Sequence, residues 1–287
     1  MTPTRSPTPT PTPTRPAPVR AGAAAAIRPY RALARVAARN VLAYRLNFVL
    51  GMAGVLLQLL AMLSIWAVLL DSGASVGGFS WPQMKAYLLV AYVTGTLMSF
   101  SDWEMAGRIR DGLVAVDLTR PVDYQRARFA EIAGVVAVEL CFSLTVCAAV
   151  LAITGPVPVP PPGQLALFVA SLLLVVPLKF TTVYLTALLC FWTQNIFGVA
   201  LARGAITNLF SGALVPLTLL PGWLQAIAAV LPFAQLTFTP ALIYLGEATG
   251  ADAWRLIGMQ LGWTAVLWWG ARLAWRRAVR QLTVHGG

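Results

Sequence analysis

Few side chains in this 287-residue chain could perform covalent chemistry. The only histidine, His285, lies at the extreme C-terminal end, whereas a serine or zinc protease of the membrane needs a histidine within a helix. Neither Lys85 nor Lys179 ends a glycine-rich phosphate-binding loop, so the chain lacks the P-loop of an ATPase. The three cysteines lie in apolar runs without the CxxC spacing of a metal site. We therefore predict that this chain is not an enzyme and binds no metal or cofactor itself.

The charged residues with the clearest pattern lie in one polar stretch, residues 101–129. Apolar residues recur there at helical spacing, from Met105 through Ile109 and Leu113 to Val116. Pro121 prevents a helix from simply continuing. This pattern predicts a short amphipathic helix over about 102–116 that lies parallel to a membrane and docks on a cytoplasmic partner. A solvated loop is the alternative.

The rest of the chain has the composition of a membrane protein. Hydrophobic residues make up 58% of it and charged residues only 11%, a balance that a soluble domain of this size would not tolerate. Most of the apolar stretches approach the roughly 20 residues that cross a bilayer. These stretches are Phe48–Leu70, Pro82–Phe100, Ile132–Thr154, Leu165–Trp192, Ile196–Leu220, Gly222–Leu245 and Leu256–Ala271.

The basic residues decide how many of these seven stretches cross. Most arginines precede the first stretch, separate the second from the third, or follow the last. Six crossings place all three groups on one side, which the positive-inside rule makes the cytoplasm. Three prolines, Pro221, Pro232 and Pro240, interrupt the sixth stretch. We therefore predict an all-α membrane protein whose residues 47–280 form six transmembrane helices, with both termini cytoplasmic. Residues 221–245 are predicted to form a re-entrant or surface-lying helical hairpin on the outer side, between spans five and six.

The two ends of the chain have simpler patterns. Residues 1–27 are rich in Thr and Pro and are predicted to be a disordered cytoplasmic tail. Residues 28–46 carry arginines at helical spacing opposite an apolar side, which predicts an amphipathic helix on the membrane surface. A solvated start of the first span is the alternative. Residues 281–287 are predicted to be a second cytoplasmic tail.

Three charged residues, Glu139, Lys179 and Arg203, lie within the predicted spans. A charge at such depth is costly unless it faces protein or water. At 1.5 Å per residue, Glu139 and Lys179 come to roughly 15 and 20 Å from the inner surface, so the two can pair. Two interpretations stay open: polar groups that line a translocation path, and an ion pair that fixes helix packing.

The order of these elements resembles the membrane permease subunit of bacterial type-2 ABC transporters. The stretch Ile109-Arg110-Asp111-Gly112, followed by Leu118-Thr119-Arg120-Pro121, is similar to the "IRxG … LxRP" signature of a six-helix subfamily. The resemblance covers roughly residues 28–280. It implies an exporter permease in the bacterial inner membrane that depends on a separate ATPase dimer, which would bind ATP and Mg. It also implies a second permease subunit, identical or related, and contact with membrane lipid.

The resemblance further implies roles for individual residues. The helix over about 102–116 would be the coupling helix that docks on the ATPase, and the hairpin would form the outer gate. The implied coupling residues are Glu104, Arg108, Ile109, Arg110, Asp111, Gly112 and Arg120, and the gate residues are Pro221, Trp223, Pro232 and Phe233.

We interpret the net charge of +11 as an orientation signal and not as a nucleic-acid surface. A non-ABC transporter or channel, and a membrane scaffold or lipid-handling protein, are the alternatives.

Overall fold

The computed structural model describes residues 23–70, 77–98, 101–193 and 196–281. Within these ranges the chain forms eleven α-helices and four short 3-10 helices, and no described residue belongs to a β-strand. The all-α prediction is thus confirmed for the described part of the chain. Most of the predicted Thr/Pro tail, and the C-terminal tail after residue 281, lie outside the described residues.

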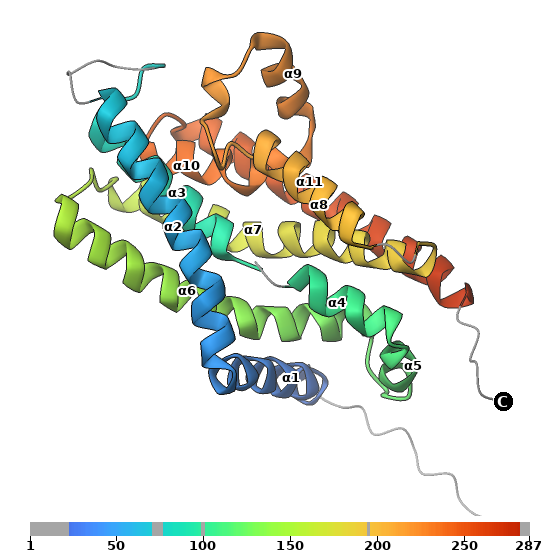
Figure 1. Cartoon of the computed structure of the whole chain (residues 1–287). Coiled ribbons are helices and arrows are strands. Elements are labelled where there is room, and N and C mark those ends of the chain that lie inside the picture. Colours follow the sequence, from blue (N-terminus) through green and yellow to red (C-terminus); the bar gives the residue numbers. More distant parts are fainter. Residues whose placement is uncertain (1–22, 71–76, 99–100, 194–195, 282–287) are drawn as a thin grey trace, which may run out of the picture.

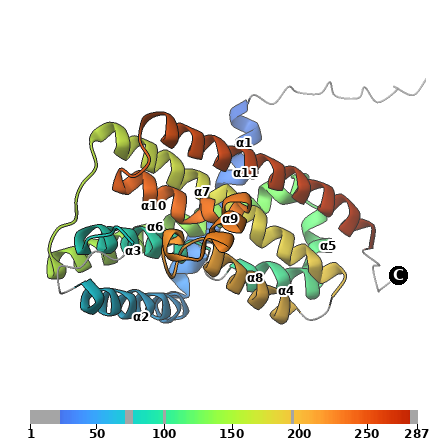
Figure 2. The ribbon, with the colours of Figure 1, turned by 90° about the horizontal axis from the view of Figure 1, so that it is seen from above.

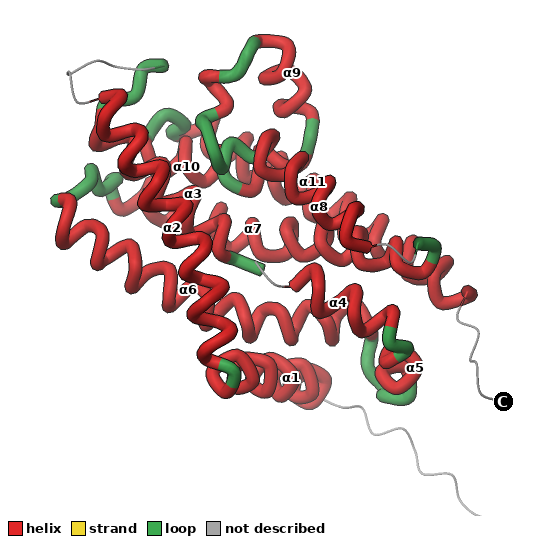
Figure 3. Tube along the Cα trace, viewed as in Figure 1, coloured by secondary structure: helices red, strands yellow, loops and turns green. Residues whose placement is uncertain are grey.

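The helices follow the chain in a simple order (Figures 1 and 3). They are α1 (Ala23–Ala43), α2 (Arg45–Leu70), α3 (Trp81–Thr96), α4 (Ser101–Arg110), α5 (Leu113–Leu118), α6 (Tyr124–Thr154), α7 (Pro162–Leu188), η1 (Leu189–Phe191), α8 (Ile196–Phe210), η2 (Leu217–Leu219), α9 (Gly222–Val230), η3 (Pro232–Leu236), α10 (Phe238–Leu245), α11 (Gly250–Ala278) and η4 (Val279–Gln281).

Three helical stretches among the described residues are long and apolar enough to cross a membrane: Phe48–Leu70, Tyr124–Thr154 and Pro162–Phe191. They match the first, third and fourth predicted spans. With 16 and 15 residues, α3 and α8 are shorter, about 24 and 22 Å against a hydrocarbon core of about 30 Å. The predicted spans through Phe100 and Leu220 therefore end earlier as helices, at Thr96 and Phe210. A multi-pass membrane protein is supported, while the count of six crossings stays a prediction.

Helix α1 meets α2 at a sharp change of direction at Tyr44. Figure 1 shows α1 end-on while α2 runs across the view. The arginines of α1, such as Arg35, are exposed, whereas Leu33 and Ala34 on another side of α1 are half-buried. That side packs on α6. Helix α1 covers the range 28–46 only up to Ala43, and residues from Arg45 belong to α2. An amphipathic helix on the membrane surface stays a prediction.

Helix α7 lies at the centre of the molecule, packed against α11, α10 and α4 (Figure 2). Its residues Val175, Leu178, Phe180 and Val183 are fully buried. Tyr124 at the start of α6 stacks on Trp275 of α11, with ring centroids 4.1 Å apart. Residues of α6, α7 and α11 thus share one apolar cluster, and a second cluster lies between α2, α3 and α6.

Residues 221–245 are divided where the sequence places its prolines. Pro221 precedes α9 and Pro232 begins η3, because a proline suits the first turn of a helix but not its interior. Pro221 and Trp223 are exposed on the projecting α9, whereas Pro232 is buried and Phe233 packs against the core. Helix α10 packs on α7 and α3. The predicted gate residues therefore divide between an outlying helix and the body of the molecule, and a re-entrant hairpin stays a prediction.

The six-crossing topology makes a direct labelling prediction. In a background without the three native cysteines, a cysteine at Glu247 should react with a membrane-impermeant maleimide added to intact cells. A cysteine at Arg277 should react only after the membrane is opened, because six crossings place the C-terminal end of α11, with Arg272, Arg276 and Arg277, in the cytoplasm. Both positions are exposed in the structure, so accessibility of the side chain itself does not limit labelling. Reaction at Arg277 in intact cells would contradict this topology.

Candidate functional site

Polar and charged side chains gather at two places. One is formed by α4, α5 and the loop up to Asp123, which we call the elbow (residues 104–123). The other is a cavity between α2, α3, α7 and α8. Within the described ranges, no group of three His, Cys, Asp or Glu side chains is placed to hold a metal ion.

The elbow is two helices and not the single helix predicted over 102–116. The break falls at Gly112, whose φ of 71° is in the left-handed region that favours glycine. Helix α4 therefore ends at Arg110, and α5 starts in a new direction at Leu113. As a result the apolar residues separate: Met105 and Val114 are buried, whereas Leu113 and Val116 are exposed.

A buried aspartate holds the elbow together. Nη2 of Arg108 in α4 donates to both carboxylate oxygens of Asp117 in α5, at 2.9 and 2.8 Å. The guanidinium of Arg128 in α6 lies 3.6 Å from the same carboxylate and also bonds Glu131, at 2.7 Å. Arg120 lies 3.9 Å from Asp117. One carboxylate with 4% of its side chain exposed thus joins α4, α5 and α6.

These contacts change the acidity of Arg108. Burial lowers the pKa of its guanidinium, but the hydrogen bond and negative charge of Asp117 outweigh burial and raise the pKa of Arg108 above its ordinary value. Arg108 therefore stays charged at any physiological pH. Its role in the structure is an internal contact between the two helices of the elbow.

A second contact joins the elbow to the last helix. Asp123 caps α6 by accepting a hydrogen bond from the backbone N–H of Arg126 at 2.9 Å. Its other oxygen accepts from Nη2 of Arg272 in α11 at 3.1 Å. The base of the elbow is thus fixed to both α6 and α11.

The tip of the elbow is open to solvent. Side chains of Arg110 and Asp111 are 70% and 55% exposed, and form an ion pair with each other at 3.2 Å. Beside them Leu113 and Val116 are 44% and 57% exposed. Among the other residues with a predicted coupling role, Glu104, Gly112 and Arg120 are exposed and Ile109 is half-buried. The structure therefore brings the predicted residues into one element but gives them different surroundings.

Helix α3 ends inside the apolar part of the molecule. The charged side chains of Lys179 and Glu139 form hydrogen bonds with the backbone at this end. Nζ of Lys179 donates to the carbonyl oxygens of Thr94 and Gly95, at 2.9 and 3.1 Å. The carboxylate of Glu139 accepts from the backbone N–H of Met98 at 2.7 Å, where Met98 has a φ of 60°. A helix end away from water needs such partners, because its last carbonyls have none within the helix. Lys179 and Glu139, two of the three charged residues within the predicted spans, thus both contact the C-terminal end of α3. An ion pair between the two stays a prediction.

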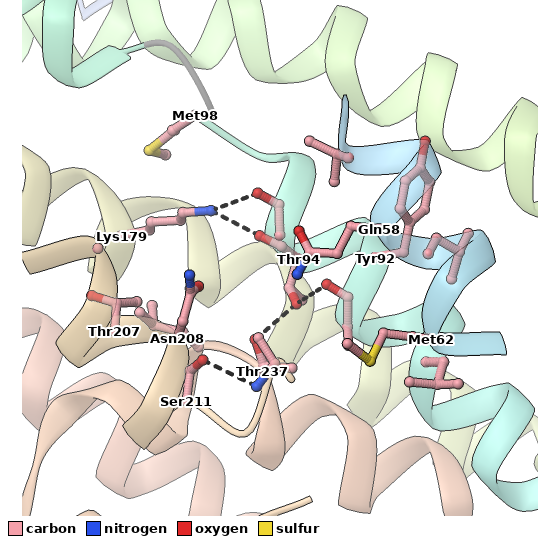
Figure 4. Close-up of a pocket in the computed structure, with 18 of the residues that line it drawn as sticks. Gln58, Met62, Tyr92, Thr94, Met98, Lys179, Thr207, Asn208, Ser211 and Thr237 are labelled. Carbon is pink, nitrogen blue, oxygen red and sulfur yellow. Dashed lines mark hydrogen bonds between the residues drawn. The ribbon is translucent and has the colours of Figure 1, made fainter. Parts of the chain in front are cut away.

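The cavity beside this helix end has a volume of about 310 Å³. Lys179 and Arg203 both line it, as two of the three charged residues predicted within the spans. In Figure 4 the side chains of Gln58, from the middle of α2, and Asn208, from α8, extend into the space that Lys179 also reaches. Thr94 and Thr237 share a hydrogen bond of 2.9 Å across one wall.

Sequence reasoning missed several of these residues. Gln58 and Asn208 were signalled by their place within apolar stretches, since amides are costly in lipid. Asp117 was signalled by being an acidic residue between Arg108 and Arg120. Neither sequence pattern shows which residue such a side chain contacts, because the fold determines that contact.

A family model described as an ABC-2 family transporter protein matches residues 55–286. No curated protein matches the chain, and no solved structure does.

Proposed function

Because this chain belongs to the ABC-2 family of transporter proteins, we propose that it is the permease subunit of an ABC exporter in the bacterial inner membrane. In this proposal the chain crosses the membrane six times, with α2, α3, α6, α7, α8 and α11 as the spans. Two such subunits, identical or related, form the transmembrane path. Two separate ATPase subunits on the cytoplasmic side bind ATP and Mg and supply the energy.

The observation that carries the proposal is the construction of the elbow. Its base is fixed by Asp117, which contacts arginines from α4 and α6, and by Asp123, which contacts α11. Its tip exposes Arg110 and Asp111 beside the apolar Leu113. An element with a fixed base and an exposed tip of mixed polarity suits a contact that transmits force from a partner.

Such a contact can drive an alternating path. When ATP closes the two ATPase subunits, the groove that holds each elbow tip moves with them. The ion pairs of Asp117 and Asp123 make the elbow move as one piece with the start of α6 and the C-terminal end of α11. The membrane helices then change between inward- and outward-facing packing, which is a rigid-body transition biased by the nucleotide.

The C-terminal end of α3 is the place where the chain can bend when the elbow moves. The chain leaves α3 at Thr96 and enters α4 at Ser101. Contacts from Lys179 and Glu139 hold the backbone up to Met98 in place. The elbow can therefore turn relative to α3 without breaking a continuous helix, since the helical hydrogen bonds already end there.

The proposal predicts the effect of Arg110→Glu. This side chain is 70% exposed, so the substitution should leave folding unchanged while reversing charge at the tip. We expect at least about tenfold weaker co-purification of an ABC ATPase expressed together with this chain, because reversing a charge at an interface removes its electrostatic complementarity. Arg277→Glu, on the exposed end of α11, is the matched control and should keep the ATPase bound. Undiminished association of the Arg110→Glu variant would show that the tip is not the coupling contact.

A further inference from the structure

A further cavity, of about 270 Å³, lies between α1, α4 and the N-terminal part of α6 (Figure 1). Along α6 its lining changes from the charged Arg128 and Glu131 to the apolar Ile132 and Val135. In the six-crossing topology Ile132 begins the third predicted span at the cytoplasmic side. The cavity therefore lies at the level where the polar surface of the protein meets the bilayer.

The apolar wall of this cavity comes from α1. It consists of Leu33, Val36, Ala37 and Val41, and no arginine of α1 is among the described residues that line the cavity. Val36 is 55% exposed, so the cavity opens at the surface of α1. Apolar side chains of a helix on the membrane surface contact the acyl chains of lipids. The wall therefore suits the first methylene groups of a lipid.

The charged side chains around the cavity balance. Three arginines and two carboxylates line it, and the carboxylate of Asp117 lies directly behind them. The lining residues are Arg108, Arg120, Arg128, Glu104 and Glu131. Asp117 bonds Arg108 and lies 3.6 Å from Arg128, which also pairs with Glu131. Electrostatic complementarity favours a head group that carries both signs of charge over one with a net charge.

Glu104 and Arg120 are the charged groups of the cavity that the protein engages least. Nη1 of Arg120 is 3.9 Å from Asp117, which is beyond hydrogen-bond distance, and its side chain is 52% exposed. Its N–H donors can therefore bind an anionic oxygen. Glu104 is exposed and forms no ion pair or hydrogen bond with another described residue. Its carboxylate can accept charge-assisted hydrogen bonds from an ammonium group.

From the balanced charges, these two side chains and the apolar wall we infer that the cavity binds the head group of a zwitterionic phospholipid. Arg120 holds the phosphate, Glu104 accepts hydrogen bonds from the ammonium group, and the wall of α1 receives the first methylene groups. A volume of about 270 Å³ is small for a ligand pocket, so the acyl chains remain in the bilayer. The place of this lipid in the cytoplasmic leaflet rests on the proposed function, to which the inference adds a lipid partner.

The test uses the full-length chain purified in a neutral detergent and three probes. These are dioleoyl phosphatidylethanolamine, dioleoyl phosphatidylglycerol with the same chains and a net negative charge, and phosphoethanolamine as the free head group. We expect phosphatidylethanolamine to raise the unfolding temperature saturably and to bind at least about tenfold more tightly than phosphatidylglycerol, because only its ammonium group can bond Glu104. Phosphoethanolamine should have no effect.

Two results would overturn this inference. Equal binding of phosphatidylglycerol would contradict the preference for a zwitterion. Equal stabilisation by phosphoethanolamine would show a site for a soluble zwitterion and contradict the role of the apolar wall.

Variants of the two contact residues locate the effect, and both side chains are exposed enough for folding to continue. Glu104→Gln should weaken phosphatidylethanolamine binding about tenfold and leave phosphatidylglycerol binding undiminished, because it removes only the partner of the ammonium group. Arg120→Gln should weaken both lipids, since both carry a phosphate. Glu247→Gln and Arg277→Gln, exposed charges that do not line the cavity, are the matched controls and should change nothing.

Unchanged lipid binding in both Glu104→Gln and Arg120→Gln would refute the site. Because lipid binding is measured on the chain without its ATPase, the two proposals fail separately. A chain that binds the ATPase but shows no lipid preference would contradict only this inference, whereas a chain with the lipid preference and no ATPase association would contradict the proposed function.

Discussion

Replacement of Asp117 with Ala is expected to release the elbow from the body of the protein. Removing this carboxylate leaves Arg108 without its carboxylate partner and Arg128 paired with Glu131, and the side chain of Arg128 is 4% exposed. Breaking a buried ion pair by removing one partner costs about 3–5 kcal/mol. About 3 kcal/mol raises the population of an opened state more than about a hundredfold. Trypsin should therefore cleave after Arg108, which Asp117 no longer holds, far faster, and ATPase association should be lost.

The matched control is Asp111→Ala in the same elbow. Its side chain is 55% exposed and its ion pair joins only the neighbouring Arg110. An exposed pair of this kind contributes about 0–1 kcal/mol, so cleavage after Arg108 should keep nearly its original rate. If Asp117→Ala were cleaved no faster than Asp111→Ala, the buried network would not hold the elbow, and the lever mechanism would lose its basis.

Replacement of Gly134 with Ala is expected to separate α1 from α6. An added Cβ at Gly134 would overlap the backbone carbonyl of Ala34, with the carbonyl carbon 2.7 Å away. A backbone cannot give way as a side chain can, so the two helices must move apart along their contact. Overpacking of this kind costs about 1–3 kcal/mol. We expect a lower unfolding temperature in detergent and faster maleimide labelling of a cysteine at the half-buried Ala38.

Gly262→Ala in α11 is the control for this change. An added Cβ there meets nothing within 4 Å, and alanine favours a helix more than glycine does. This variant should unfold at the same temperature or a slightly higher one. Equal behaviour of the two variants would mean that α1 is not packed through Gly134.

The long spans could be predicted from sequence because their signal is local. Runs of apolar residues predicted where α2, α6 and α7 lie, since the length and apolarity of a stretch are what a bilayer requires. The three helices begin before the apolar runs do, and α6 begins at Tyr124 instead of Ile132. The early end of α3 could not be predicted in this way. Its partners, Lys179 and Glu139, lie 84 and 41 residues away from the groups that they bond in Gly95 and Met98. A helix end inside lipid depends on such distant contacts.

The elbow likewise has features that the sequence predicts and features that it does not. Its location followed from the polar composition of residues 101–129. The break at Gly112 was present in the sequence as a glycine, but the helical spacing from Met105 to Val116 concealed it. The inward direction of Arg108 follows from that break, because α5 turns back and brings Asp117 within 2.8 Å of its guanidinium. The spacing of residues in the sequence predicts which of them share a helix face only as far as the helix is unbroken.

In our proposal the energy for this membrane subunit comes from a separate ATPase. ATP hydrolysis tests this in the complex purified through a tag on this chain, after co-expression with an ABC ATPase and reconstitution in lipid. We predict hydrolysis that is lost when the P-loop lysine of the ATPase is replaced, and that is absent from the Asp117→Ala preparation because the ATPase no longer co-purifies. Recovery of a stably folded permease without any bound ATPase, and without effect on its hydrolysis rate, would contradict the claim.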